Sequence, residues 1–76
     1  MADGFAIELD GQISVSCVGP TEVAAQVNGL VTMFNVMVYE HTTPEHINDA
    51  WHQCVMHVPD RKVAVVPVTI ERKRGH

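Results

Sequence analysis

Apolar and polar residues alternate in two short stretches near the start of the chain. Residues 5–9 and residues 13–17 each place a larger apolar side chain at every second position, and Asp10 and Gly11 lie between the two stretches. Alternation with a period of two is typical of half-buried strands, and Asp-Gly is common in tight β-turns. The pattern predicts an N-terminal β-hairpin.

The length of the hairpin loop decides which way these apolar side chains point. A two-residue loop pairs Leu9 with Gln12 and Ile7 with Ser14, which places the apolar side chains of the two strands on opposite faces. A three-residue loop, or a bulge, places them on one face. We expect the three-residue loop or a bulge, because both apolar sets can then share one buried face.

The middle of the chain, residues 20–39, supports two interpretations. Apolar residues recur at helical spacing from Val23 to Val38 after a Gly-Pro helix start, which predicts one long helix. Alternatively, Asn28 and Gly29 end a short helix, and the β-branched residues within 30–39 form a buried strand. We favour the long helix.

Residues 42–60 carry the clearest helix signals. Thr42, Pro44 and Glu45 are typical of a capped helix start, and Pro59 marks its end. The apolar positions of this segment follow the i, i+3, i+4, i+7 rule and are Ile47, Ala50, Trp51, Cys54, Val55 and Val58. These residues are expected to face the core.

The last apolar segment, residues 62–72, predicts a strand, and Pro67 places it at a sheet edge or a bend because proline cannot donate a ladder hydrogen bond. The elements together predict a two-layer α+β domain over residues 1–71. It comprises an N-terminal β-hairpin, one or two helices, and a C-terminal strand that completes a three-stranded antiparallel sheet. The alternative is a ββαβαβ order with residues 30–39 as a strand. Residues 72–76 form a basic C-terminal tail.

The start of the chain and its longest apolar run bear on where the protein resides. The first ten residues carry acidic side chains where a secretory signal carries basic ones. The longest apolar-rich run, residues 30–39, is only half the length of about 20 residues that a membrane span needs. We therefore expect a cytoplasmic protein without membrane contact, in which Cys17 and Cys54 stay thiols.

The charges are unevenly distributed along the chain. The first sixty residues hold eight carboxylates and no Lys or Arg, whereas all five basic residues lie between positions 61 and 74. This layout predicts an acidic body that faces a basic protein partner. The expected contacts are Glu22, Glu40, Glu45 and Asp49. The alternative, nucleic-acid binding through Arg72, Lys73 and Arg74, is less favoured, because affinity for phosphate scales with the number of cations.

The second half of the predicted long helix is apolar on all sides. Met33, Val36 and Tyr39 fall on the side away from its main apolar stripe. A helix that is apolar all round needs burial on both sides, and a two-layer domain this small covers one. We therefore predict a homo-oligomer, with these three residues at the contact between subunits.

Three histidines in residues 46–57 raise the question of a metal site. His46, His52 and His57 do not stand three or four residues apart, as helical zinc ligands must, and Asp49 offers only one further ligand beside them. A site shared across a dimer is the alternative. No cofactor is expected.

Catalytic motifs are absent from the sequence. It contains no glycine-rich phosphate loop, no Gly-x-Ser-x-Gly and no Cys-x-x-Cys. The sequence therefore predicts a non-enzymatic interaction module that self-associates and presents an acidic surface to a protein partner. A regulator fits this description, as does a phage or mobile-element inhibitor of a nucleic-acid-binding complex.

Overall fold

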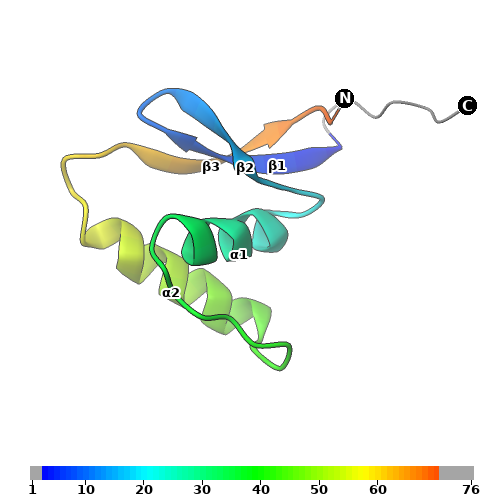
Figure 1. Cartoon of the computed structure of the whole chain (residues 1–76), viewed down its shortest axis with the longest axis vertical. Coiled ribbons are helices and arrows are strands. Elements are labelled where there is room, and N and C mark those ends of the chain that lie inside the picture. Colours follow the sequence, from blue (N-terminus) through cyan, green and yellow to red (C-terminus); the bar gives the residue numbers. More distant parts are fainter. Residues whose placement is uncertain (1–2, 71–76) are drawn as a thin grey trace, which may run out of the picture.

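The computed structural model describes residues 3–70, which form three strands and two helices in the order ββααβ (Figure 1). The elements are β1 (Gly4–Leu9), β2 (Gln12–Gly19), α1 (Glu22–Thr32), α2 (Pro44–Met56) and β3 (Val63–Val68). The strands form one antiparallel sheet in the order β2-β1-β3. The predicted α+β class, the hairpin and the C-terminal strand are confirmed.

Both helices lie on one side of the sheet (Figure 1). Helix α1 packs across β2 and β1, and α2 packs mainly against α1 rather than against the sheet. The core between them is formed by Ile7, Cys17, Ala25, Leu30, Ile47 and Trp51, all buried. No helix within residues 3–70 combines the length and the apolar character that crossing a membrane requires.

The hairpin loop has two residues, so the expected three-residue loop is wrong. Asp10 and Gly11 adopt φ angles of 51° and 86°, and positive φ at both positions is what a type I′ turn requires. Leu9 therefore pairs with Gln12, and the turn fits the twist of the strands. An irregularity does occur, but farther along, between Phe5 and Ile7 of β1.

This register places the apolar residues of β2 on two faces of the sheet. Ile13 pairs with Glu8, next to the buried Ile7, so the side chain of Ile13 points away from the helices. Ile13 and Val15 are 43% and 85% exposed. The irregularity then turns β2 so that Cys17 enters the core, where it is fully buried.

Residues 33–39 are neither helix nor strand, so both interpretations of this segment are wrong. Helix α1 ends at Thr32, and the backbone N–H of Val36 donates to the Leu30 carbonyl at 2.8 Å. Asn35 adopts a φ of 55°, in the left-handed region that commonly ends helices. The chain then runs irregularly, and Val36 and Val38 pack individually against the core.

Helix α2 begins close to its predicted position. Its N-cap is Thr43 rather than Thr42, and the Thr43 hydroxyl accepts from the His46 N–H at 3.2 Å. Pro44 occupies the first turn, where it needs no intrahelical partner. The hydroxyl of Thr42 instead accepts from the Tyr39 N–H. The strong local start signals were therefore sufficient to place this helix.

Asp10 joins the hairpin turn to the start of β3. Its carboxylate accepts from the Lys62 N–H at 2.9 Å and from Arg61 Nε at 2.6 Å, and its own N–H donates to the Lys62 carbonyl. The backbone hydrogen bond from Lys62, followed by the Arg61 guanidinium, holds the pKa of Asp10 below its ordinary value of 3.8. These hydrogen bonds hold the hairpin turn against the residues that precede β3.

Replacing Asp10 with asparagine is expected to flatten the acid side of the pH–stability curve. Because its pKa is lower in the folded protein than in the unfolded chain, the Asp10 carboxylate stabilises the fold at every pH above 3.8. That contribution is lost as the pH falls through the folded pKa. Urea denaturation of wild type and Asp10→Asn between about pH 2 and pH 6 measures the difference. Asp60→Asn, which removes an exposed carboxylate just before Arg61, is the control, and an unchanged curve for Asp10→Asn would contradict the linkage.

Candidate functional site

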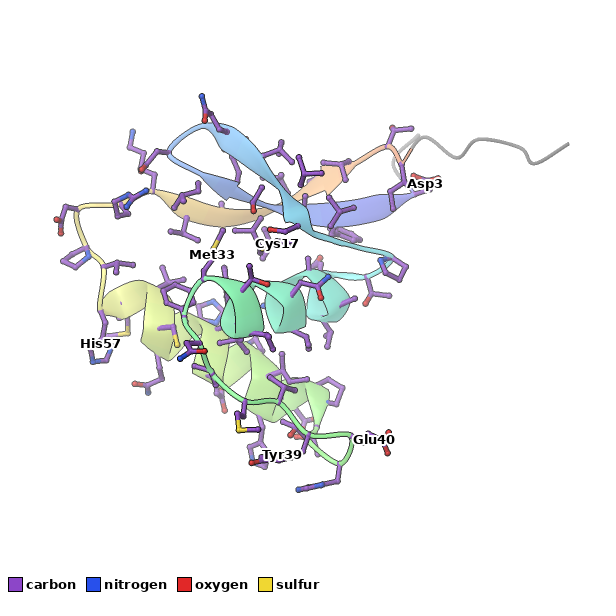
Figure 2. All side chains as sticks on the ribbon, viewed as in Figure 1. Asp3, Cys17, Met33, Tyr39, Glu40 and His57 are labelled. Atoms are coloured by element: carbon purple, nitrogen blue, oxygen red, sulfur yellow. The ribbon has the colours of Figure 1, made fainter. Side chains whose placement is uncertain are left out.

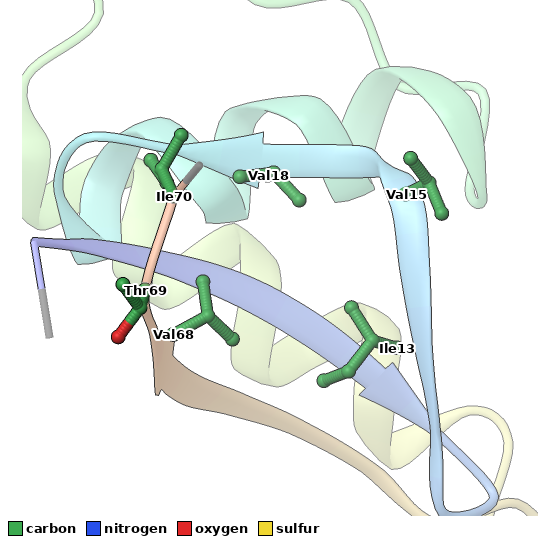
Figure 3. A pocket seen from close by; sticks show the side chains of 6 residues that line it. All are labelled: Ile13, Val15, Val18, Val68, Thr69 and Ile70. Atoms are coloured by element: carbon green, nitrogen blue, oxygen red, sulfur yellow. The ribbon is translucent and has the colours of Figure 1, made fainter. Parts of the chain in front are cut away.

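The face of the sheet opposite the helices carries an apolar groove. The groove has a volume of about 470 Å³ and lies between β2 and the end of β3 (Figure 3). Its lining residues are Ile13, Val15, Val18, Val68, Thr69 and Ile70. An uncovered surface built from branched aliphatic side chains is typical of interaction sites.

Small residues of β1 lie beneath the residues that line this groove. Gly4 and Ala6 are buried and pair with Val68 and Val66, on the face away from the helices. Ile70 lies so close over Gly4 that a Cβ at that position would collide with it. Beside these small residues, β2 turns sharply near Val15 (Figure 3). The small residues and the turn together make the surface concave.

The chemistry of the groove suits apolar side chains. Its lining has no charged side chain and no thiol or imidazole, and Thr69 supplies the one side-chain hydroxyl. General acid–base catalysis and metal binding require such groups. The groove is therefore suited to hold hydrophobic groups.

The three apolar residues that were expected at a subunit contact lie in different surroundings. Met33 and Val36 are half-buried and pack against the core of the same chain, and Figure 2 shows Met33 between the sheet and the helices. Tyr39 is 56% exposed at the far end of the molecule, where its ring stacks on His41. The expected second face of a helix does not form, because residues 33–39 are not helical.

The four expected acidic contacts all remain exposed to solvent. Glu22 opens α1, Glu45 lies in the first turn of α2, and Asp49 follows one turn later. Glu40 lies beside Tyr39 on the loop before α2 (Figure 2). Glu22 also lines a second groove of about 250 Å³ between α1, α2 and β3.

The histidines of α2 bond to their own helix. Nδ1 of His52 donates to the Asn48 carbonyl at 2.8 Å, and Nδ1 of His57 donates to the Gln53 carbonyl at 2.7 Å. Within residues 3–70, no three His, Cys, Asp or Glu side chains come together as metal ligands would, and this includes His46, Asp49, His52 and His57. A metal site within one chain has no support in this part of the molecule.

The basic residues Arg72, Lys73 and Arg74, proposed for nucleic-acid binding, lie outside the described residues. No known protein family, curated protein or solved structure matches the chain. The function is therefore inferred from the surfaces described above. The sequence interpretation missed the groove residues, although the two-residue Asp-Gly turn was the signal that could have located Ile13 and Val15 on the outer face.

Proposed function

We propose that this chain is a non-enzymatic protein-interaction module that self-associates through the apolar side of its sheet. The observation that supports the proposal is a sheet covered by helices on one face only, with aliphatic residues on the other. Burying apolar surface is worth about 25 cal/mol for each Å² removed from water. A second molecule on this surface would supply that burial.

The module also offers an acidic surface to a basic protein partner. Glu22, Glu40, Glu45 and Asp49 are exposed, and none of them belongs to the apolar groove. Charged side chains of this kind steer association and suppress wrong partners. A regulator or inhibitor that covers the basic surface of a nucleic-acid-binding complex, such as one from a phage or mobile element, fits both properties.

Replacing Val15 with lysine is expected to dissociate the self-associated form. Val15 is 85% exposed, so the change leaves the core intact, but it would place an unpaired ammonium group in an apolar contact. We expect the dissociation constant to rise by more than about tenfold, which corresponds to roughly 1.4 kcal/mol. Sedimentation velocity over a concentration series measures the change.

The matched control is Val31→Lys. Val31 is also an exposed valine, 50% accessible on α1, and lysine near a helix C-terminus is well tolerated. The two variants have the same net charge, so only the position differs. A wild-type protein that stays monomeric at the highest concentration, or a Val15→Lys protein that sediments like wild type, would remove the basis of the proposal.

A further inference from the structure

We infer that two copies of this chain join edge to edge along β2, in antiparallel register about Ser14, to form one continuous six-stranded sheet. The inference rests on the proposed self-association and names a second copy as the partner. The pairing joins the two β2 edges, and of the residues that line the groove only Ile13 and Val15 take part in it. It follows from three properties of β2: its free edge, its lack of charge, and the self-complementary order of its side chains.

The sheet has two free edges, and they differ in how well they are protected. β3 contains Pro67, which has no N–H to donate, and follows the cations Arg61 and Lys62. Proline and basic residues are the usual means by which natural proteins block pairing at an edge. β2 contains neither, so its straight first part, residues 12–15, is an open edge.

β2 itself carries no charged side chain, and this favours a second copy as the partner. Eleven consecutive residues, 11–21, carry no charged side chain, although the chain has a net charge of −4. β2 therefore offers a basic partner no carboxylate of its own, and Glu8, opposite Ile13, belongs to the neighbouring strand. Two acidic copies, by contrast, repel each other least where charges are missing.

The hairpin register determines which backbone N–H and C=O groups of β2 are available to pair with a second strand. The two-residue turn makes Leu9 and Gln12 a hydrogen-bonded pair, and hydrogen-bonded and non-hydrogen-bonded pairs then alternate along the strands. Ile13 therefore directs its N–H and C=O groups away from β1, and we place those of Val15, which follows the last regular pair of Ile7 with Ser14, in the same direction. These groups can bond to a second strand.

The order of side chains in β2 matches its own reverse about Ser14. In antiparallel pairing centred there, Ile13 of each copy lies opposite Val15 of the other, on the outer face of the sheet. β-Branched pairs of this kind stabilise neighbouring strands. The two Ser14 residues meet at the two-fold axis as a non-hydrogen-bonded pair, with Cα atoms about 4.5 Å apart. Such an isologous contact closes as a dimer.

The register predicts that cysteines introduced at position 14 of both copies would form a disulfide across the two-fold axis. A Cα separation of about 4.5 Å is within the range that a disulfide spans. The test uses Ser14→Cys in a Cys17→Ala background, since the Ser14 hydroxyl lies 3.5 Å from Cys17 Sγ. Ser16→Cys in the same background is the control, because residue 16 would lie opposite Gln12 of the other copy and not opposite itself. On mild oxidation, Ser14→Cys should form covalent dimer at least about tenfold faster than Ser16→Cys.

Amide hydrogen exchange of the wild-type chain provides the second measurement. The N–H groups of Ile13 and Val15 should become protected as the concentration rises, and Val15→Lys should abolish that effect. If the wild-type protein dimerises but Ser14→Cys is no faster than Ser16→Cys and these amides stay unprotected, the copies do not pair along β2. The register is then wrong, whereas self-association stands. A monomeric wild-type protein would overturn both proposals.

Discussion

Replacing Trp51 with alanine is expected to lower the free energy of unfolding by about 3–5 kcal/mol. Trp51 is 4% exposed and meets the ring of Phe34 edge to face, with ring centroids 5.6 Å apart. Trp51 also contacts Gly29 of α1. This contact helps to hold α2 in place, because α2 packs against α1 and makes few contacts with the sheet. The alanine variant would leave a cavity at the junction of both helices.

Because a domain of this size has a stability near the lower end of about 5–15 kcal/mol, much of the Trp51→Ala protein should be unfolded at 25 °C. Urea denaturation followed by far-ultraviolet circular dichroism measures the loss. Met56→Ala is the matched control: Met56 is an apolar residue of the same helix, but it is 74% exposed. An unchanged midpoint for Trp51→Ala would show that α2 is held by other contacts.

Local signals predicted most of the regular structure. The start of α2 is specified by a threonine cap and Pro44, and the alternation in residues 5–9 identifies β1 whatever its partner. Residues 33–39 were not predictable in the same way. Their spacing favours a helix and their β-branched residues favour a strand, and the left-handed Asn35 ends the helix before either pattern can continue.

The hairpin shows why the candidate site was missed. The alternation of apolar residues in both strands favours one shared buried face, and a two-residue loop is incompatible with that arrangement. The turn residues adopt the positive φ angles that a two-residue loop needs, so Ile13 and Val15 stay outside the core. The sequence predicts an uncovered apolar surface on residues 33–39, whereas the apolar groove lies on the sheet.

The two surfaces of the molecule are chemically distinct. The charge-free residues 11–21 include all of β2, whereas Glu40, Glu45 and Asp49 lie on the loop before α2 and on α2 itself. Helix α1 lies between the sheet and α2 (Figure 1). A dimer joined along β2 would therefore leave both acidic surfaces open, and one dimer could engage two basic sites at once, with the gain in avidity that this allows.

Replacing Gly29 with alanine tests how closely the two helices approach. Helix propensity alone predicts that this change stabilises α1 by about 1 kcal/mol. The packing predicts the opposite, because a Cβ at Gly29 would lie 2.6 Å from Trp51 Cζ3 and 3.2 Å from Ile7 Cγ1. The indole ring cannot move aside easily, since Phe34 and the core hold it. Overpacking of this kind costs about 1–3 kcal/mol, so Gly29→Ala should lower the stability.

A second variant separates the contribution of packing from that of the backbone. In a Trp51→Leu background the aromatic atoms that collide with the new Cβ are gone, so Gly29→Ala should there be neutral or stabilising. The difference between the two backgrounds is the coupling energy of residues 29 and 51, and a double-mutant cycle in urea measures it. Thr32→Ala, at an exposed position of the same helix, is the control for propensity alone. If Gly29→Ala stabilises the wild-type protein as much as it stabilises the Trp51→Leu variant, α1 and α2 are not in close contact at Gly29.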